Sequence, residues 1–569
     1  MRILILCLLG LSCATFSAER ISRPTTTAVE LKMAPQLDGV IKNDEAWKGA
    51  MPMTDFWQVR PVEGKAASQR SEVYVGYTKN TLYVAAMLYD ESASGILVTD
   101  SRRDSKLDET DSFQIILDTY KDEQNGFVFG TNPAGIEYDG QVTKGGTAAF
   151  GSGVGGFNLN WDTNWKVRTQ ITSEGWSLEM AIPFKSLRYG NQDIQTWGIN
   201  FQRNIRRNNE IAYWAPLGLQ HNLYRVSDAG SISGIKVPSQ KNLKLTPYAL
   251  GKSVTGGSQP SDTDYEFGLD VKYSLTPSLT MDVTYNTDFA QVEADELQVN
   301  LDRFSIFLPE QRPFFLENAD QFTVGHSREA ELFFSRRIGI AANGSAIPIT
   351  GGVRVSGKIG EKTNVGFLQM RSDAVAGVAP ENDYTVARVN REFANRSSLG
   401  AIFVNREGDG SINNNKDDDH NRAYAIDGRI GIGANGSISG YLAKTETPGL
   451  TGKDHSFRVT GVYNSEKWTN RFNYTEVGID FNPEVGFLRR RDYRNLQVFT
   501  LRRYRPENLW GLHELRPHIL YNTYRKFDGY HTTSFLHVDN HWEWKNGYEI
   551  HTGMNFFHEG VQVPFNIVS

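Results

Sequence analysis

The sequence predicts an all-β protein in which an N-terminal β-sandwich precedes an antiparallel transmembrane β-barrel with an internal plug-like segment. Three observations support this prediction. Short strand-like runs separated by turn residues fill the chain up to residue 237. Beyond that point, longer runs alternate apolar and polar side chains. One charged, phenylalanine-rich segment, residues 289–330, interrupts the alternation, which then resumes.

The first residues have the pattern of a secretory signal peptide. The stretch MRILILCLLGLSCATFSA contains one arginine, an apolar run and then small residues, so we predict a signal peptide over residues 1–18. Both cysteines, Cys7 and Cys13, lie in this segment. The mature chain is therefore expected to have no disulfide and no thiolate metal site, and a secreted chain of this kind indicates a bacterial envelope.

Charge and hydropathy exclude some classes of protein. The net charge of -6 and the pI of about 6.1 provide no basic field for nucleic acid. The mean hydropathy is -0.44, and no later run approaches the roughly 20 apolar residues of a spanning helix. A β-barrel is still allowed, because only every second residue of its strands faces lipid.

The distribution of tryptophan divides the chain. Seven of the 11 tryptophans precede residue 220, and the next is Trp468. The stretch VPSQKN, 237–242, has the residues of a linker. We therefore predict a sandwich domain over residues 19–237 and a barrel domain over residues 238–569.

The sandwich prediction depends on short strands. SEVYVGYTKNTLYVAAMLYD is typical of a hairpin with Lys79 and Asn80 at its turn. Further strand patterns, each bounded by Gly, Asn, Asp or Pro, are DSFQIILDTY, WKVRTQIT, WSLEMAIP and TWGINFQRNI. Many short strands with few helical periods favour a β-sandwich.

The barrel prediction depends on a persistent two-residue period. In YEFGLDVKY, Tyr265, Phe267 and Leu269 share one face and charged residues share the other. Such alternation continues for about 300 residues, and closing the sheet into a barrel is the simplest way to remove its edges. The long polar loop 408–421 is expected on the outer face, and short turns such as LTPSL (275–279) on the periplasmic face. The spacing predicts roughly 14–16 strands. The ending VQVPFNIVS lacks a terminal aromatic residue, which leaves open that the barrel is C-terminally truncated.

Four blocks of the first domain resemble a known family. LDGVIKNDEAWKGA (37–50), DSFQIILDTYKDEQNGFVFGTNPAG (111–135), GWSLEMAIPFKSL (175–187) and TWGINFQRNI (196–205) resemble carbohydrate-binding module family 9-like domains. The resemblance covers roughly residues 35–235. It implies a sandwich fold and a glycan or oligosaccharide as partner.

The second domain shows its own resemblance. QVEADELQVNLDRFSIFLPEQRPFFLENADQF (291–322), LFFSRRIG (332–339) and VGIDFNPEVGFLRRRDYR (477–494) resemble the barrel domain of unknown function that follows a family 9-like module in many Gram-negative envelope proteins. This resemblance implies localisation in the outer membrane, with the N-terminal domain in the periplasm or at the surface. Outer-membrane lipid and the barrel-insertion machinery are the implied partners.

Aromatic and amide residues are the candidates for sugar contact. Sugar rings stack on planar aromatic side chains, while amides and charged groups bind the hydroxyls. Trp161, Trp165 and Asn160 occur together in NLNWDTNW, and Trp214 lies near Arg203 in sequence. We predict these five as the carbohydrate-binding residues. For Trp47, Trp176 and Trp197, a place in the core is favoured.

An acidic cluster is the candidate metal site. Asp108, Glu109 and Asp111 are hard oxygen ligands that could hold Ca²⁺, with a solvated acidic loop as the alternative. No other cofactor is expected. A metal site is not expected among the later histidines, which are scattered along strand patterns: His513, His518, His531, His537 and His541.

The interrupting segment is predicted to act as a plug or gate. Phe314 and Phe315 are too apolar for free solution, so the segment is expected to pack at the barrel end or inside the lumen. Arg303, Arg312 and carboxylates such as Glu317 are expected to pair with lumen charges. The arginines between 489 and 505 are expected either to favour anionic solutes or, preferably, to pair with lumen carboxylates.

Three functions remain. The leading one is an outer-membrane protein that captures glycans or oligosaccharides and assists their passage or degradation. The alternative is a structural or assembly protein whose sandwich binds a protein or peptidoglycan. A glycoside hydrolase ranks last, because no convincing GxSxG, HExxH or phosphate-loop motif is present and paired carboxylates occur by chance in so acidic a chain.

Overall fold

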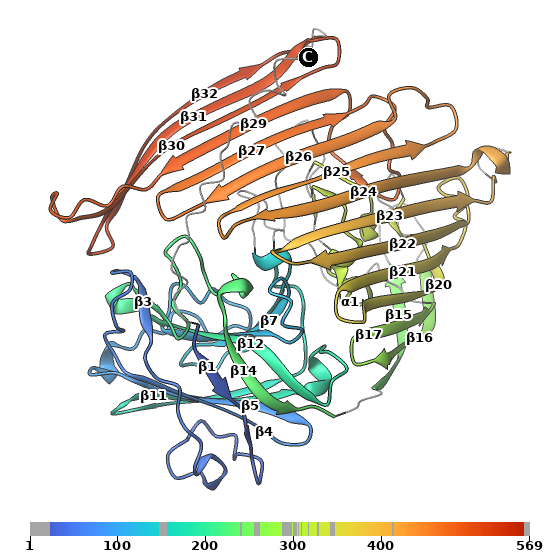
Figure 1. Ribbon diagram of the computed structural model, residues 1–569. Coiled ribbons are helices and arrows are strands. Elements are labelled where there is room, and N and C mark those ends of the chain that lie inside the picture. Colours follow the sequence, from blue (N-terminus) through green and yellow to red (C-terminus); the bar gives the residue numbers. More distant parts are fainter. Residues whose placement is uncertain are drawn as a thin grey trace.

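The computed structural model describes most of the chain as two all-β bodies (Figure 1). The described residues are 23–146, 156–238, 242–254, 262–286, 299, 304, 307–308, 310–316, 318–326, 329–341, 347–411 and 415–562. The expected signal peptide, 1–18, and two predicted gate residues, Arg303 and Glu317, lie outside them. None of the helices in the described ranges is long and apolar enough to cross a membrane.

The N-terminal body is a sandwich of two sheets. The larger sheet has the order β1 (Thr25–Thr27), β14 (Gly230–Lys236), β12 (Ile194–Ile205), β6 (Ser112–Asp118), β7 (Gly126–Thr131), β8 (Tyr138–Val142) and β9 (Phe157–Asn158). In addition, β13 (Glu210–Tyr213) pairs with β12, and β3 (Trp57–Arg60) pairs with β13. The smaller sheet has the order β10 (Lys166–Thr172), β11 (Gly175–Pro183), β5 (Thr81–Tyr89), β4 (Ser71–Tyr77) and β2 (Val29–Glu30). The predicted hairpin is β4–β5.

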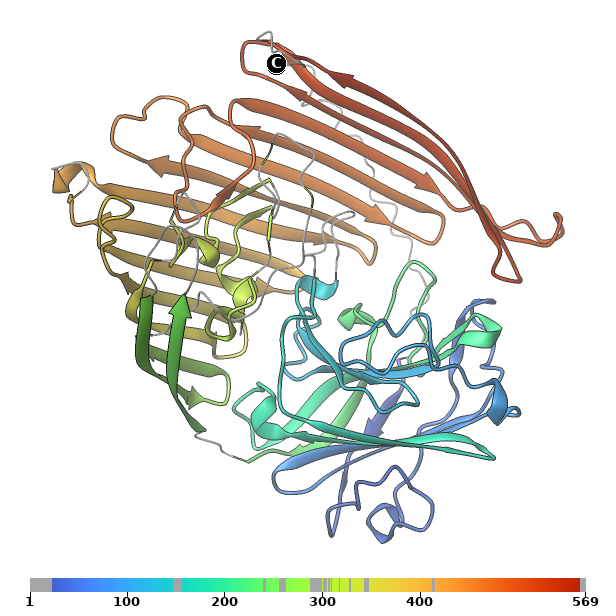
Figure 2. The ribbon, with the colours of Figure 1, turned by 180° about the vertical axis from the view of Figure 1, so that it is seen from behind.

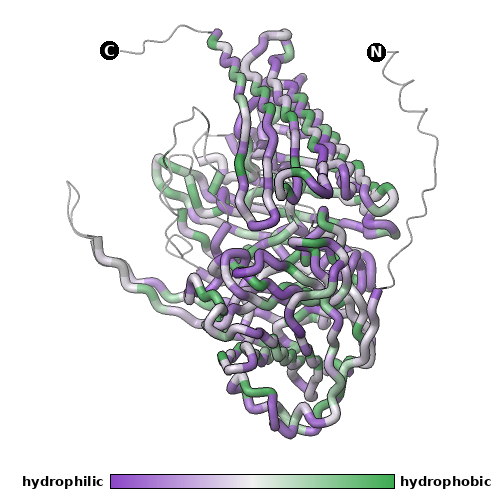
Figure 3. Tube along the Cα trace, turned by 90° about the vertical axis from the view of Figure 1, so that its left-hand side faces the viewer, coloured by the Kyte–Doolittle hydropathy of each residue, from purple (hydrophilic) through white to green (hydrophobic). Residues whose placement is uncertain are grey.

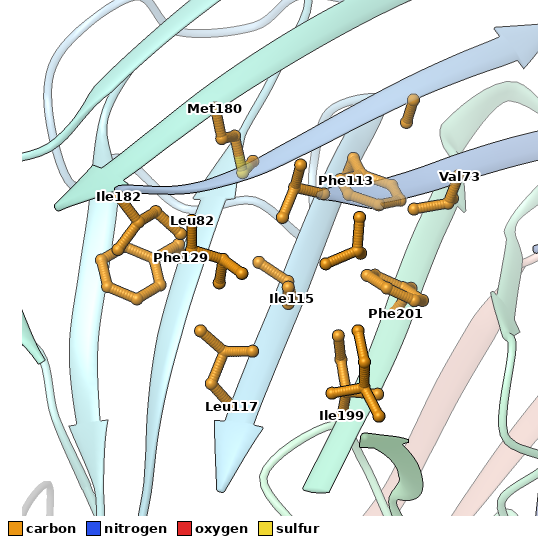
Figure 4. Close-up of a cluster of buried hydrophobic side chains, with 14 of the residues drawn as sticks. Val73, Leu82, Phe113, Ile115, Leu117, Phe129, Met180, Ile182, Ile199 and Phe201 are labelled. Carbon is orange, nitrogen blue, oxygen red and sulfur yellow. The ribbon is translucent and has the colours of Figure 1, made fainter. Parts of the chain in front are cut away.

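Apolar side chains from both sheets fill the space between them (Figure 4). Leu82 of β5 and Ile115 of β6 come from opposite sheets and are fully buried. Successive strand residues point to opposite faces, so every second side chain of a core strand reaches this layer. Burying a side chain of this size contributes roughly 1.5–3 kcal/mol. Trp176 and Trp197 are in the core as predicted, at 1% and 0% exposed.

The C-terminal body is one antiparallel meander, the barrel sheet. Its 15 described strands follow chain order: β15 (Leu243–Val254), β16 (Asp262–Thr276), β17 (Leu279–Tyr285), β20 (Ile349–Ile359), β21 (Thr363–Ser372), β22 (Asn382–Phe393), β23 (Ser397–Gly408), β24 (His420–Ile432), β25 (Gly436–Glu446), β26 (His455–Asn464), β27 (Trp468–Val477), β29 (Tyr493–Arg502), β30 (Leu512–Arg525), β31 (His531–Trp544) and β32 (Glu549–Glu559). The sheet curves as the wall of a barrel, which confirms the predicted fold class (Figure 1).

The two faces of the barrel sheet differ in polarity. The convex face carries exposed apolar side chains, among them Phe267 at 70% and Ile426 at 60%. The concave face carries polar groups such as Thr280, Asp282 and Thr284, which are buried. Figure 3 shows hydrophilic and hydrophobic residues alternating along these strands. The two-residue period of the sequence therefore separates an apolar outside from a polar inside.

A plug segment, the described residues 310–338, occupies the concave side (Figure 2). It contains α1 (Pro313–Leu316), η8 (Ala319–Phe322), β18 (Gly325–His326) and β19 (Ala330–Glu331), and β19 pairs with β28 (Phe487–Leu488). Phe314 and Phe315 are buried in one cluster with Leu368 and Val386 of the wall. The predicted internal segment is thus held by an apolar contact with the barrel sheet.

The sandwich docks on one end of the barrel sheet, where the turns between strands are short. Arg225 donates to the carbonyl of Ala434, in the turn between β24 and β25, at 2.7 Å. Asn464, where β26 ends, donates to the carbonyl of Gln220 at 3.2 Å. The long loop 408–421 lies at the other end of the same strands.

Candidate functional site

A chamber of about 1090 Å³ lies where the sandwich, the plug segment and the inner wall of the barrel sheet meet. The sandwich contributes the edge formed by β7, β8 and β9, and the wall contributes residues of β20 to β29. A pocket of this size is in the range that holds a ligand of drug or oligosaccharide size. We take the chamber as the candidate binding site.

On the sandwich side, two stacked aromatic rings line the chamber. The rings of Phe157 and Tyr224 lie 4.3 Å apart between centroids and are tilted by 8°. The Tyr224 hydroxyl forms a hydrogen bond of 3.1 Å with the Tyr138 hydroxyl, which holds the Tyr224 ring in place. Both stacked residues are half-buried. They form an aromatic surface with a hydrogen-bonding group at its edge.

Three amide side chains surround these rings. Gln141 and Asn158 are register partners on β8 and β9, so the two amides leave the sheet side by side. Asn160 is exposed, lines the chamber, and its backbone N–H donates to Asn158 Oδ1 at 3.1 Å. Amides offer both donors and an acceptor. The arrangement can therefore bind neighbouring hydroxyl groups of one ligand.

On the wall side, a bidentate ion pair spans two strands. Arg388 of β22 donates to the Asp427 carboxylate of β24 at 2.6 and 2.8 Å. Gly400 on the intervening strand β23 makes this reach feasible, because a Cβ there would lie 2.5 Å from the Arg388 Nη1. A fork of this kind holds the guanidinium in one orientation beside the chamber.

A buried charge cluster joins the sandwich to the barrel sheet at the chamber floor. Lys358 of β20 pairs with Asp122 of the sandwich and, at 2.8 Å, with Glu392 of β22. The three side chains are at most 6% exposed, and Lys358 also lies 4.6 Å from the centre of the Tyr120 ring. Burial, with the neighbouring Asp122 charge, raises the pKa of Asp118 well above its usual value. Breaking such a buried cluster leaves uncompensated charge.

The structure corrects the expected placement of the three tryptophans. Trp161, Trp165 and Trp214 are only 7%, 2% and 6% exposed and belong to the sandwich core. Trp161 packs on Phe127 with centroids 5.0 Å apart, and Trp214 packs on Phe201 at 5.7 Å. Their ring faces are covered by protein because the loops that carry them fold back between the sheets. A sugar contact at these rings would require the core to open.

Trp165 is held from its polar end as well. Its Nε1 donates to Asp139 Oδ1 at 3.2 Å, and Arg103 pairs with the same carboxylate. Burial raises the pKa of Asp139 to about 6, although Arg103 and the indole act in the opposite direction. The Asp139 carboxylate thus has a structural role that the sequence did not indicate.

Arg203 is also placed away from the chamber. It is 1% exposed and donates to the carbonyls of Arg70 at 2.8 Å and Tyr89 at 2.6 Å, and to Ser71 Oγ at 3.0 Å. Desolvation lowers its pKa to about 10. The guanidinium therefore connects the two sheets. Of the five predicted carbohydrate residues, only Asn160 lines the chamber.

The acidic trio does not converge. Asp108 and Glu109 are exposed, whereas Asp111 is buried. Both oxygens of Asp111 accept backbone amides, from Leu97 at 2.9 Å and from Arg206 at 2.6 Å. These bonds account for the burial of Asp111 without a cation, and Ca²⁺ binding by the trio stays a prediction.

Of the predicted plug residues, Arg312, Phe314 and Phe315 lie within the described part of the chain. Arg312 is buried and pairs with Glu310 at 2.7 Å, and it donates to the carbonyls of Ser335 and Ile338. These partners belong to the plug segment itself, because the segment folds back on itself. Phe315 lines the chamber below the Arg312 guanidinium, which is 4.4 Å from the ring centre.

The arginines between 489 and 505 have several kinds of partner. Arg505 pairs with the buried Glu514 at 2.8 Å, whereas Arg494, which is 45% exposed, pairs with Glu476 at 3.1 Å on the face opposite the buried Tyr493. Arg490 lies over the Phe304 ring at 4.0 Å. Pairing of the whole group with lumen carboxylates stays a prediction.

The sequence did not single out Phe157, Tyr224 or Gln141, which form the chamber wall on the sandwich side. A weak signal was available, because FNLN places an aromatic residue directly before two amides. The contact of Asp122 with Lys358 had no local signal, since 236 residues separate the two positions.

The fold and the chamber define a class of protein: an all-β, two-domain chain in which a sandwich closes the short-turn end of a plugged, barrel-type antiparallel sheet. Residues 240–358 match the family model described as Domain of unknown function (DUF5916). This span includes the plug segment, where one of the sequence resemblances was placed, so the expected domain of unknown function is confirmed there. No curated protein matches the chain.

The chain is similar to several solved structures, each at low identity. A carbohydrate-binding module family 9 from Caldicellulosiruptor kristjanssonii, in complex with glucose, is 16% identical and covers 38% of this chain and 97% of its own, with a TM-score of 0.26. A putative carbohydrate-binding protein from Bacteroides uniformis is 13% identical over 37% and 99%, with a TM-score of 0.30. A Rhodopseudomonas blastica porin, a triple mutant, is 8% identical over 78% and 98%, with a TM-score of 0.23.

Proposed function

We propose that this chain is an outer-membrane protein that captures a glycan or oligosaccharide in the chamber between its sandwich and its barrel sheet. The observation that carries the proposal is the stacked pair Phe157–Tyr224 with the amides of Gln141, Asn158 and Asn160 beside it. An aromatic face with adjacent amides matches the apolar C–H face and the hydroxyl rim of a sugar ring. The chamber of about 1090 Å³ gives room for several sugar units.

The membrane part of the proposal is supported by the convex face of the barrel sheet. Large apolar side chains are exposed there from Phe267 on β16 to Phe556 on β32. A water-exposed surface of this kind is unfavourable, whereas lipid covers it without cost. Outer-membrane lipid and the barrel-insertion machinery are accordingly the proposed partners.

The position of the sandwich supports an orientation. Outer-membrane barrels have short turns on the periplasmic side and longer loops outside. The sandwich docks at the short-turn end, so we place it in the periplasm, where it would receive or deliver a glycan. Passage through the barrel sheet would require the plug segment to move, because Phe314 and Phe315 are packed against the wall.

Glycan binding is tested with the full mature chain in detergent. An array of oligosaccharides identifies the ligand, with cellotriose as a first probe, and calorimetry measures its affinity. Replacing Gln141 and Asn160 by alanine together should weaken binding about tenfold or more, because each amide makes a hydrogen bond worth about 1 kcal/mol. Asn191→Ala removes an exposed amide outside the chamber and should leave affinity unchanged.

Two results would contradict the glycan proposal. One is an intact, membrane-inserted chain that binds no glycan on the array, which would favour the structural or assembly role. The other is a double variant that binds as tightly as the parent. The membrane proposal has its own test: heat-modifiable migration on gels and outer-membrane fractionation are expected, and a mature chain found only in the aqueous fraction would reject it.

A further inference from the structure

The last three described strands bring histidines and carboxylates together on the concave face. On β31, His537, Asp539 and His541 alternate with apolar or amide residues in the pattern HVDNH. Residues two apart on a strand share a face. The register with β30 places His518 directly opposite Asp539. The four side chains therefore form one group, although 23 residues separate its ends.

The ring nitrogens converge on one carboxylate oxygen. The His541 Nε2 lies 3.1 Å from Asp539 Oδ2, and the His537 Nε2 lies 3.7 Å from the same atom. The Nε2 atoms of His518 and His537 lie 3.2 Å apart. Four ligand atoms that bind one Zn²⁺ at about 2.0–2.1 Å in a tetrahedron are themselves roughly 3.3 Å apart. The spacings of 3.1, 3.2 and 3.7 Å are of this order, and ligand atoms of His518, Asp539 and His541 all lie within 4.8 Å of one another.

The opposite nitrogen of each ring faces a hydrogen-bond acceptor. The His518 Nδ1 lies 3.0 Å from the carbonyl oxygen of Arg516, and the His537 Nδ1 lies 2.6 Å from Asn555 Oδ1. The His541 Nδ1 lies 3.3 Å from Glu549 Oε1. Since these oxygens accept, they favour the tautomer with the proton on Nδ1, which leaves Nε2 available to a metal ion. Metal-binding histidines are oriented in this way by their outer partners.

Two features of the group call for a cation at its centre. The Nε2 atoms of His518 and His537 lie 3.2 Å apart, a distance at which either a proton or a bound cation must lie between the two nitrogens. Asp539 is 8% exposed, and among the described residues its Oδ1 has no hydrogen-bond partner. An uncompensated buried carboxylate is unfavourable.

We propose that His518, His541 and Asp539 bind one divalent transition-metal ion, with Zn²⁺ as the best fit. Two imidazole nitrogens and one carboxylate suit zinc, whereas Ca²⁺ and Mg²⁺ prefer oxygen ligands. The fourth tetrahedral position is left to water or to the adjacent His537. The ion would cross-link β30 to β31. The inference is independent of glycan binding, because none of the four residues lines the chamber.

The test measures metal content directly. The full chain in detergent is stripped with a chelator, dialysed against Zn²⁺ and analysed by elemental mass spectrometry. One zinc per chain is expected for the parent and none for His518→Ala or His541→Ala. Co²⁺ in place of Zn²⁺ is expected to give the visible absorption of a tetrahedral complex. His558→Ala removes a histidine from β32 outside the group and should keep the metal.

Other outcomes would overturn the proposal. The parent could take up no zinc, or the two alanine variants could bind it as the parent does. A third result would assign the ion to the neighbouring group of His541, Glu549 and His551. In that case His551→Ala would lose the metal, whereas His518→Ala would keep it. Circular dichroism and heat-modifiable migration of every variant show whether metal is lost because a ligand is missing or because the protein is unfolded. Asp539→Asn keeps the shape of the side chain and should weaken zinc binding without unfolding the protein.

Discussion

The sandwich and the barrel sheet use the same alternation of side chains with opposite polarity. In the sandwich, Leu82 and Ile115 point inward and are fully buried. In the barrel sheet, Phe267 and Ile426 point outward and are 70% and 60% exposed, while the concave side carries ion pairs such as Arg388–Asp427. A period of two residues specifies that a strand has two unlike faces. Which face is inside depends on the surrounding solvent.

The two interiors are consequently stabilised in different ways. The sandwich has one continuous apolar layer (Figure 4). The barrel sheet has a polar concave face, and the plug segment provides apolar contacts there through Phe314, Phe315 and Phe322. Lys358 connects the two bodies through charge. Apolar burial therefore stabilises the sandwich, whereas hydrogen bonds and charge pairs stabilise the concave side of the barrel sheet.

The largest effect is expected in the sandwich core. Trp197→Ala removes a fully buried ring and should lower the free energy of unfolding of the sandwich by about 3–5 kcal/mol. Unfolding of the N-terminal body in denaturant, monitored by its resistance to protease, measures this loss. Trp510, which is 77% exposed in the barrel domain, is the matched control, and Trp510→Ala should change little. Equal effects of the two variants would contradict the comparison.

The next effect concerns the charge cluster between the bodies. Lys358→Met leaves Asp122 and Glu392 buried without a cation, which should weaken docking of the sandwich by about 3–5 kcal/mol. Hydrogen exchange of residues 119–126 should rise in the full chain. Lys362→Met changes an exposed lysine of the turn that follows β20 and serves as control. Unchanged exchange in Lys358→Met would show that docking does not depend on this pair.

A third variant tests which medium faces the convex side. Ile426 lies in the middle of β24, so Ile426→Arg should cost about 2–4 kcal/mol when the chain is folded in lipid bilayers. Ile194 of the sandwich is equally exposed, at 60%, and Ile194→Arg should stay within about 0.5 kcal/mol of the parent. If both substitutions were neutral, the convex face would not contact hydrocarbon.

The smallest effect is a pH dependence in the sandwich. Burial raises the pKa of Asp139 to about 6, so the folded state binds a proton more readily than the unfolded chain. The stability that this group contributes is therefore full below about pH 4 and is lost as the pH rises through about 6, by about 2–3 kcal/mol. Asp139→Asn should reduce this slope in melts between pH 4 and 7, whereas Asp108→Asn, at an exposed site, should not. An unchanged slope in Asp139→Asn would reject the assignment.

Much of the fold could be predicted because strand patterns are local. The hairpin of β4 and β5, the core positions of Trp176 and Trp197, and the outward face of Phe267 all follow from neighbouring residues. The plug segment was also predictable, since its phenylalanines interrupt a regular alternation. Its internal Arg312–Glu310 pair was not, because it depends on how the segment folds back.

The candidate sites were less predictable. A tryptophan in a polar stretch has the same local sequence whether it faces a ligand or the core, and Trp161 and Trp165 proved to be buried. Asn160, two residues beyond Asn158, lines the chamber because strand β9 turns there. The histidines on β30 and β31 looked scattered in the sequence, and only the strand register brings them together.

The sequence by itself determined the two β bodies, the two faces of each strand and the interrupting segment, because residues close in the chain set these features. The tertiary structure decided which rings are covered, how Lys358 meets Asp122, how the chamber forms and how His518 meets Asp539. The physical reason is that strand pairing and docking depend on many weak contacts between distant residues, and no local pattern records their sum.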